Sequence, residues 1–179
     1  MRLLTVGHGT LPSSDLAALL ERARVDLLVD VRRYPASRRH PQFNHDVMAH
    51  WLGRASIDYR HEPDLGGRRP PAPRSRHIGL TLPSFRGYAE HMGTDDWRRA
   101  FERVLAVSRE CAVALLCAES VWWRCHRRLI ADVAVLVHGV DVDHLFHDGR
   151  VGPHRVTDAA RVEDGAVVYD VGADRPLVE

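Results

Sequence analysis

Residues 112–139 read AVALLCAESVWWRCHRRLIADVAVLVHG and contain one complete strand-to-helix unit. The run AVALLC at 112–117 has no charged side chain, which is typical of a strand buried on both faces of a sheet. Apolar residues then recur at helical spacing between Leu129 and Val137, so we expect a helix over 124–138 that ends at Gly139. A fully apolar strand followed by an amphipathic helix indicates a parallel sheet covered by helices.

Short apolar runs of the same kind occur along the rest of the chain and alternate with amphipathic stretches. They lie at 3–6, 25–31, 57–60 and 140–146. This alternation predicts an α/β fold of the three-layer, Rossmann-like type, with a mostly parallel sheet of about five strands and helices on both faces.

The length of the chain fits a single α/β domain over residues 1–179. Two stretches lack a clear period. Residues 63–83 are rich in Pro and Gly and are predicted to form a long irregular loop. Residues 149–179 are predicted to form a C-terminal hairpin or tail against the sheet edge.

The composition, 45% hydrophobic and 27% charged, is ordinary for a globular protein. No apolar run reaches the roughly 20 residues that a spanning helix needs, and the N-terminus shows no signal-peptide pattern. Three cysteines, an odd number, do not suggest a disulfide framework in a chain of this size. We therefore expect a cytoplasmic protein with reduced thiols and no membrane association.

All 25 basic residues are Arg, and the net charge is only +1. Their placement is uneven, because Arg is concentrated over residues 32–76 and acids outnumber bases after residue 141. A local basic surface suits an anionic small molecule or a nucleic-acid backbone, and the planar Arg fork fits phosphate and carboxylate groups. GC-rich codon usage is the alternative explanation for the abundance of Arg.

Reactive side chains follow almost every predicted strand. Parallel α/β sheets bind ligands outside the carboxyl ends of their strands, so we expect these residues to surround the functional site. In chain order they are His8, then Asp30 and Arg32, then His61 and Glu62, then Cys117 and Glu119, and finally His147.

The segment from Cys117 to Arg128 carries the strongest local signal. Arg124 and Arg127 lie at the expected helix start, where free N–H groups and the helix dipole favour an anion. A thiol at such a position has a lowered pKa, so Cys117 or Cys125 is a candidate nucleophile. Helical spacing also allows Cys125 to pack into the core, and a strand end also allows Cys117 to be buried.

Candidates for acid–base chemistry are His126, His8 and Glu119. The many nearby arginines would keep carboxylates ionised, which favours roles for Glu119 and Glu62 in binding substrate or orienting Arg. Asp30 is expected to orient Arg32 or a histidine.

Two further features have open interpretations. Gly7, His8 and Gly9 form a turn like that of a nucleotide-binding unit, without the full G-x-G-x-x-G spacing. The pair Trp122 and Trp123 either packs the loop or offers a stacking surface for a base.

Several unusual motifs occur in order along the chain. They are VGHGT at 6–10, LLVDVRRYPASRRHPQFN at 27–44, IDYRHEPDLGGRR at 57–69, SFRGYAEHM at 84–92, ALLCAE at 114–119, CHRRLIAD at 125–132 and HLFHDGRVGPHR at 144–155. Together they resemble the bacterial domain-of-unknown-function family numbered 488. The resemblance implies a compact α/β fold and no established reaction, and Gly9 stands where such proteins often have Ser. The signature residues that it implies are Asp30, Arg32, Pro35, Cys117, Glu119, Cys125, His126 and Arg127.

Three hypotheses follow for the function. The first is an enzyme acting on an anionic, phosphate-containing substrate such as a nucleotide or nucleic-acid component, with catalytic groups Cys117, Cys125, His126, His8 and Glu119. Substrate would be bound by Gly7, Gly9, Asp30, Arg32, His61, Glu62, Arg124 and Arg127. The second is a non-catalytic nucleic-acid-binding or ligand-sensing module that uses the basic 32–76 surface. The third is a metal-binding protein that uses Cys117, Cys125 and nearby histidines, although no standard zinc spacing is present.

Overall fold

The computed structural model of the chain describes residues 2–70 and 74–172. In chain order its elements are β1 (Arg2–Gly7), α1 (Ser13–Arg22), β2 (Leu27–Asp30), α2 (His45–Arg54), β3 (Asp58–His61), α3 (Pro83–Met92), α4 (Asp95–Val107), β4 (Val113–Cys117), α5 (Arg127–Leu136), β5 (Asp141–Leu145), β6 (Val151–Pro153), β7 (Ala160–Glu163) and β8 (Ala166–Tyr169). Single helical turns cover Pro41–Phe43, Pro63–Leu65 and Trp122–Arg124.

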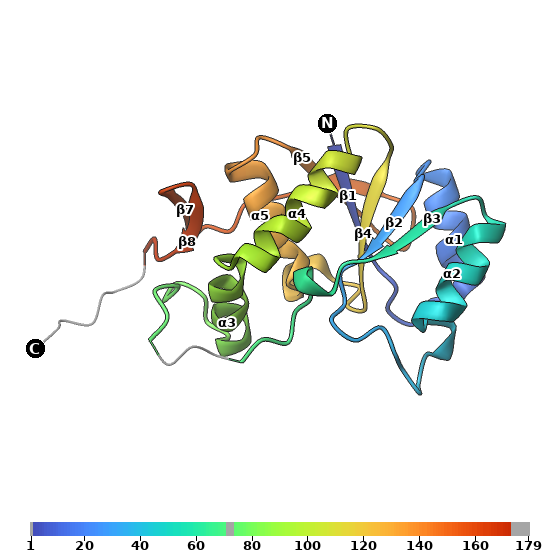
Figure 1. The fold of residues 1–179 in the computed structure, drawn as a ribbon, viewed down its shortest axis with the longest axis horizontal. Helices are drawn as coiled ribbons and strands as arrows, with labels where there is room; N and C mark the ends of the chain where they lie inside the picture. Colours follow the sequence, from blue (N-terminus) through green and yellow to red (C-terminus); the bar gives the residue numbers. More distant parts are fainter. Residues whose placement is uncertain (1, 71–73, 173–179) are drawn as a thin grey trace, which may run out of the picture.

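The main sheet has six strands in the order β3-β2-β4-β1-β5-β6. The first five of these run parallel to their neighbours, and β6 pairs with β5 in the antiparallel sense. Helices α1 and α2 cover one face, and α3, α4 and α5 cover the other (Figure 1). The predicted three-layer, Rossmann-like α/β fold is confirmed, with β6 as an additional edge strand.

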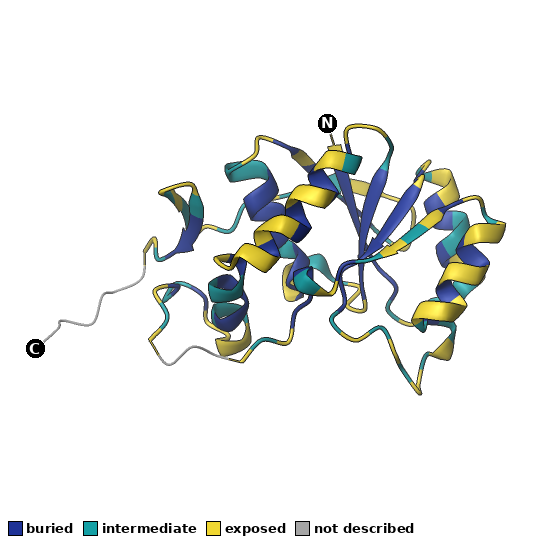
Figure 2. Ribbon diagram, in the orientation of Figure 1, coloured by how far each residue is buried: buried dark blue, intermediate teal, exposed yellow. Residues whose placement is uncertain are grey.

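Burial follows the position of each strand in the sheet (Figure 2). Every residue of the central strand β4 is buried, because helices cover it above and below and strands flank it on both sides. The edge strand β3 instead alternates between exposed and half-buried residues, as expected for a strand with one free edge. Along α4, Trp97, Phe101 and Val104 are buried at helical spacing, which fixes that helix against the sheet.

The chain leaves the neighbouring strands β2 and β4 in opposite directions. From β2 it passes through α2 to β3 at one edge, and from β4 it passes through α5 to β5 beyond β1. Because α2 and α5 lie on opposite faces, a crevice opens between the carboxyl ends of β2 and β4. This is the topological switch point at which parallel α/β sheets bind ligands.

The helix that was predicted to begin at Arg124 begins three residues later, at Arg127, and it ends at Leu136 instead of residue 138. Arg124 closes a single helical turn in which the Cys125 N–H donates to Trp122 O, 3.1 Å away. Cys125 itself is extended, with φ −122° and ψ 151°. The predicted placement of Cys125 inside a helix is therefore wrong.

The predicted irregular loop at 63–83 contains one helical turn at its start and the first residue of α3 at its end. Within this stretch, residues 71–73 lie outside the described part of the chain. Residues 74–82, the last before α3, form no helix or strand in the structure.

Residues 149–179 were predicted to form a hairpin or tail against the sheet edge. In the described part of this stretch β6 joins that edge, whereas β7 and β8 form a separate two-stranded sheet. Asp164 and Gly165 turn between these strands with φ values of 50° and 75°, the left-handed pair that a type I′ hairpin turn requires. The Tyr169 hydroxyl donates to Asp132 in α5, 3.0 Å away, so this hairpin is anchored on α5. Residues 173–179 lie outside the described part of the chain.

In the described ranges, no helix combines the length and the apolar character that crossing a bilayer would require.

Candidate functional site

Two thiols and one imidazole meet at the carboxyl end of β4. The Nδ1 atom of His126 lies 3.6 Å from the Cys125 sulfur and 3.8 Å from the Cys117 sulfur. All three ligand atoms lie within 4.8 Å of one another, and all three residues are buried. The structure thus brings together three of the five predicted catalytic residues, which we call the thiol–imidazole cluster.

The hydrogen bond on the far side of the His126 ring fixes its tautomer. Nε2 lies 3.0 Å from Val31 O, and a carbonyl oxygen only accepts, so Nε2 carries the hydrogen. Nδ1 is therefore the ring nitrogen that faces the two sulfurs, and the ring becomes positively charged when a thiol transfers its proton to Nδ1. An imidazole held in this way is able to take a proton from a thiol or to bind a metal ion.

The two thiols have opposite electrostatic surroundings. Burial alone would raise the pKa of Cys125, but the hydrogen bond from Cys117 and the charges of His126 and Arg127 outweigh burial and lower that pKa well below its ordinary value. The hydrogen bond to Cys125 and burial raise the pKa of Cys117 well above its ordinary value. The cluster therefore favours a Cys125 thiolate that accepts a hydrogen bond from the Cys117 thiol.

Arg127 contacts the cluster from the protein interior and is 1% exposed. Its Nε donates to the Cys125 sulfur at 3.4 Å, and its guanidinium also donates to Glu119 O and to the Thr5 hydroxyl. Arg127 was predicted to bind substrate. Its donors are instead directed at protein groups, among them the Cys125 sulfur, and Arg127 does not line the cavity beside the cluster.

The cluster forms one wall of a cavity of about 330 Å³, which we call the thiol cavity. This cavity lies at the switch point between β2 and β4. Its lining comes from Arg32, Arg33 and Tyr34 after β2, from Cys117, Ala118 and Glu119 after β4, from Arg124, Cys125 and His126, from Gly67 and Arg68, and from Ser84, Phe85 and Tyr88 of α3.

Gly67 and Tyr88 belong to this site although the sequence patterns did not single them out. A Cβ atom on Gly67 would lie 2.8 Å from His126 Nδ1, so the absence of a side chain allows this loop to pass over the imidazole. The Tyr88 ring meets the His126 ring edge-on at 5.0 Å, and its hydroxyl donates to Leu65 O at 2.7 Å. For Gly67, the Gly66-Gly67 pair is the sequence signal that could have pointed to the site.

Arg32 and His8 lie together beside the cluster. The Arg32 guanidinium donates to both oxygens of Asp30 and to Phe43 O, and its Nη1 lies 3.2 Å from His8 Nε2. Burial and the charge of Arg32 lower the pKa of His8 to about 4. His8 does not line the thiol cavity, and its ring stacks on Phe43 instead.

Gly7 and Gly9 face the loop that follows β4. The backbone of Glu119 passes against the Cα atom of Gly7, and Ser120 lies against Gly9, whose φ is +52°. Both glycines therefore have a packing role beside the site, and neither lines the thiol cavity.

His61 and Glu62 point away from the thiol cavity. His61 Nε2 donates to Arg32 O at 2.8 Å, and the Glu62 carboxylate accepts from Arg103 at 2.6 Å and 3.1 Å. Neither residue lines the cavity. His147, from the end of β5, donates to Gly7 O at 2.6 Å.

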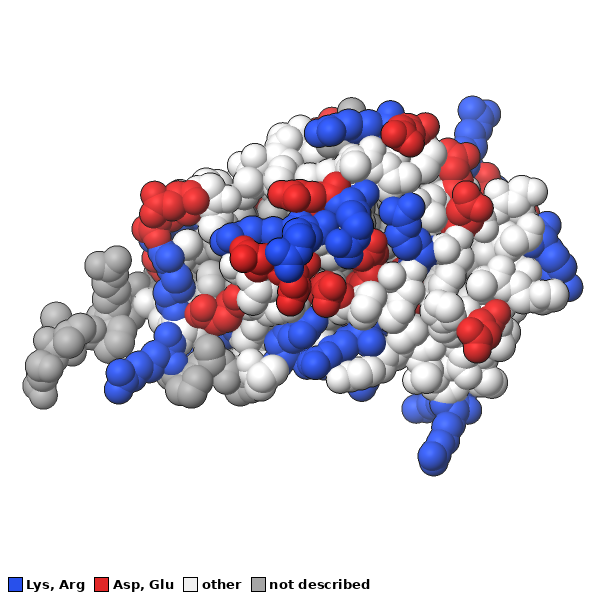
Figure 3. All heavy atoms as spheres, viewed as in Figure 1, with Lys and Arg blue, Asp and Glu red and all other residues white. Residues whose placement is uncertain are grey.

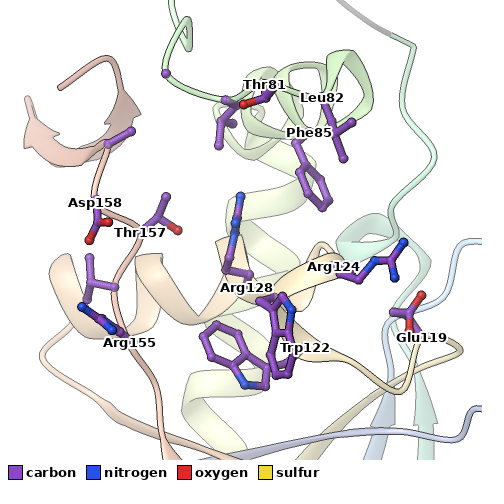
Figure 4. Close-up of a pocket in the computed structure, with 15 residues that line it drawn as sticks. Thr81, Leu82, Phe85, Glu119, Trp122, Arg124, Arg128, Arg155, Thr157 and Asp158 are labelled. Atoms are coloured by element: carbon purple, nitrogen blue, oxygen red, sulfur yellow. The ribbon is translucent and has the colours of Figure 1, made fainter. Parts of the chain in front are cut away.

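A second cavity of about 790 Å³ adjoins the thiol cavity and shares Phe85, Glu119 and Arg124 with it. We call it the arginine–tryptophan cavity. Figure 4 shows Arg128 rising from α5 in its centre, with Arg155 and Asp158 on one side and Arg124 and Glu119 on the other. Trp122 and Trp123 also line it.

The arginines of residues 32–76 do not act as one free basic surface. Arg32 is buried against Asp30, and Arg76 pairs with Glu163. On the face shown in Figure 3, basic and acidic side chains are interspersed over α4, where Arg98 and Arg99 pair with Asp95 and Asp96.

The fold and the site define a three-layer α/β protein with a thiol–imidazole cluster at the carboxyl end of its central strand. The chain belongs to the family described as Domain of unknown function DUF488, whose profile matches residues 14–134. The match includes Cys117, Cys125 and His126 and excludes His8 and the C-terminal hairpin, and it confirms the family resemblance. No curated protein and no solved structure matches the chain.

Proposed function

We propose that the protein is a thiol-dependent enzyme that acts on an anionic, phosphate-containing substrate in the thiol cavity. The observation that carries this proposal is the convergence of Cys117, Cys125 and His126 on a cavity at the switch point of the sheet. A thiolate that receives hydrogen bonds from a second thiol and an arginine is the form of cysteine that attacks an electrophile.

The cavity also has the charge that such a substrate needs. Arg33 and Arg124 line it, and Arg124 makes no ion pair with any described residue. Guanidinium groups bind phosphate through paired, charge-assisted hydrogen bonds. An anion held by these arginines would face the Cys125 sulfur.

In the proposed reaction, Cys125 Sγ bonds to the electrophilic atom of the substrate, and the bond from that atom to the leaving group breaks. The leaving group takes the proton that His126 Nδ1 received from the thiol. Water then attacks the same atom, returns a proton to His126 and releases Cys125 as the thiolate. Glu119, at the cavity entrance, has a carboxylate oxygen 3.1 Å from the Val121 N–H and is placed to bind a substrate hydroxyl.

The test compares turnover of a panel of phosphate esters and nucleotides by the wild-type chain, Cys125→Ser and Cys111→Ser. Cys111 is half-buried and lies outside the cluster, so its variant is the matched control. We expect Cys125→Ser to lose turnover, and intact-mass measurement after quenching to find a substrate adduct on the Cys125 peptide of the wild type. Full turnover by Cys125→Ser would eliminate the thiol mechanism.

A second candidate function, metal binding, is favoured by the same geometry. Two sulfurs and one imidazole nitrogen within 4.8 Å of one another match the three protein ligands of a Cys₂His zinc site, and Val31 O would act as the outer partner of His126. Elemental analysis of protein purified without an affinity tag separates the two candidates. One zinc per chain that is lost in Cys117→Ser and Cys125→Ser would favour the metal site, whereas metal-free protein that turns over substrate would exclude it.

A further inference from the structure

The arginine–tryptophan cavity contains cationic groups that are not neutralised by the protein. Arg124, Arg128 and Arg155 line it, and none of them forms an ion pair within the described part of the chain. The Nε atom of Arg128 is buried and has no hydrogen-bond partner there. Because buried donors in proteins are nearly always bonded, an unsatisfied guanidinium nitrogen in a side chain that lines a cavity indicates that the protein does not supply its acceptor.

The position of the Arg128 side chain is set by packing. Its guanidinium carbon lies 5.1 Å from the centre of the Phe85 ring, and Figure 4 shows the side chain extending from α5 across the middle of the cavity. A cation held over an aromatic face keeps its outer edge free to bind a ligand. The donors of Arg128 are therefore presented to the cavity before any ligand arrives.

An aromatic surface lies beside these cations. Trp122 is stacked on His144 with ring centres 4.0 Å apart and planes 7° apart, so one face of its indole is covered. Trp123 meets Trp122 edge-on at 5.6 Å and is 50% exposed. Trp122 thus supports Trp123, and the exposed half of the Trp123 side chain offers aromatic surface for stacking.

Two carboxylates, Glu119 and Asp158, lie at opposite ends of the same cavity (Figure 4). They leave the three arginines in excess, and carboxylates accept hydrogen bonds from sugar hydroxyls or from exocyclic amino groups. The volume of about 790 Å³ is in the range of small-molecule sites. Cation, aromatic face and carboxylate acceptor together match a phosphate, a base and a ribose.

We propose that the arginine–tryptophan cavity binds a nucleoside 5′-phosphate unit, with the phosphate on Arg128 and Arg124 and the base stacked on Trp123. This rests on the proposed function in one respect, because the shared residues Arg124 and Glu119 would direct the phosphate end of the unit toward the thiol cavity. The unit comes either from a free nucleotide or from a single strand, and both sources offer the same phosphate and base.

Binding is measured on the full-length Cys125→Ser chain, so that no chemistry intervenes, with AMP as the probe. Adenosine and ribose 5-phosphate are the matched probes that lack the phosphate and the base. We expect AMP to bind saturably by calorimetry and to quench tryptophan fluorescence, and adenosine and ribose 5-phosphate to bind at least about tenfold more weakly. The quench reports on this cavity because Trp51 and Trp97 are buried in the core.

Three variants assign the site. Arg128→Met is expected to weaken AMP binding about tenfold or more, the loss typical of a charge-assisted hydrogen bond. Trp123→Leu is expected to remove most of the quench and to weaken binding. Arg124→Met, at an exposed position, repeats the first test without touching a packed side chain, and the exposed Arg39→Met is the control that should leave AMP affinity unchanged.

A short single-stranded oligonucleotide distinguishes the two sources. If the oligonucleotide binds more tightly than AMP and its affinity depends on Arg128 and Trp123 in the same way, the unit belongs to a single strand. If the oligonucleotide binds more weakly than AMP, the unit belongs to a free nucleotide. AMP affinity that is unchanged in Arg128→Met and Arg124→Met, equal binding of ribose 5-phosphate, or no saturable AMP binding would overturn the proposal. If turnover requires Cys125 but AMP affinity does not change in Arg128→Met, this inference is refuted and the thiol mechanism stands. If turnover does not require Cys125, the thiol mechanism is refuted and this inference stands.

Discussion

The guanidinium of Arg32 is clamped on the carboxylate of Asp30, with Nε 2.8 Å from Oδ1 and Nη2 2.6 Å from Oδ2. The Asp30 side chain is fully buried and that of Arg32 is 8% exposed. The Tyr59 hydroxyl adds a further hydrogen bond to Asp30 at 2.8 Å. An arginine that the sequence predicted to bind an anion therefore has its strongest contact with an anion of the protein itself.

Replacing Arg32 with Met should lower the free energy of unfolding by about 3–5 kcal/mol, because Asp30 would remain as a buried charge without its cation. Urea denaturation measures this loss. Arg39→Met, which alters an exposed arginine of the same segment, should change stability by less than about 0.5 kcal/mol. A loss below about 1 kcal/mol for Arg32→Met would mean that the Asp30–Arg32 pair is not closed in solution.

Cys125 should react with iodoacetamide at lower pH than Cys111 does. The surroundings of Cys125 lower its thiol pKa, whereas burial and then the charge of Asp26 raise the pKa of Cys111. Peptide mass spectrometry of samples alkylated from pH 5 to pH 10 follows both thiols in one chain. His126→Asn should move the Cys125 profile toward higher pH, and an unmoved profile would show that His126 does not support the thiolate.

Substituting Gly67 with Ala should disturb His126, because the added Cβ would lie 2.8 Å from Nδ1. We expect slower alkylation of Cys125 near neutral pH and a stability loss of about 1–3 kcal/mol, typical of overpacking. Gly53→Ala is the matched control, since a Cβ there has no atom within 4 Å and lies in α2. That control should be neutral or stabilising by up to about 1 kcal/mol. Equal alkylation rates in both variants would remove Gly67 from the site.

Stability should fall as the solution is acidified below pH 6.5. Burial lowers the pKa of His8 to about 4, and burial and the charge of His154 lower that of His144 to about 3. Between the unfolded value of 6.5 and these values the unfolded chain binds protons that the folded chain does not. Each such histidine therefore lowers the free energy of unfolding by about 1.4 kcal/mol for every pH unit of acidification in this range. Urea midpoints measured from pH 7 to pH 4 should show a shallower slope in His144→Asn, and the exposed His50→Asn should keep the wild-type slope.

Asp132 should be essential for docking the C-terminal segments on α5. Its carboxylate accepts from His154 at 2.9 Å, from the Thr157 N–H and hydroxyl at 2.9 Å and 2.7 Å, and from Tyr169 at 3.0 Å. Asp132→Ala leaves these buried donors unpaired and should cost about 3 kcal/mol or more. Hydrogen exchange should show faster exchange across β7 and β8. Glu110→Ala, at an exposed carboxylate, is the control, and equal protection of the hairpin in both variants would contradict this role for Asp132.

The layered architecture, and the edge of the sheet at which the site lies, could be predicted from the amino-acid sequence alone. The periods of apolar residues report which face of an element is buried, so β4 and its neighbours and the helices on both faces were predictable. Cys117 at the end of a buried strand placed a thiol at the switch edge for the same reason. The start of α5 was not predictable. The helical spacing of residues continues back to Arg124, but Trp122–Arg124 form a separate turn before the helix begins.

Which reactive residues come into contact could not be predicted from the sequence and follows from the three-dimensional packing. The spacing of apolar residues reports which side chains are buried, but not which residues they contact. Those contacts depend on the order of the strands in the sheet. Because β4 lies between β2 and β1, Cys117 lies beside Val31 and beside His126, which is hydrogen-bonded to Val31. The same packing paired Glu62 with Arg103 and placed Gly67 over the imidazole of His126. These contacts join residues far apart in the chain, and a one-dimensional pattern carries no record of the distances between them.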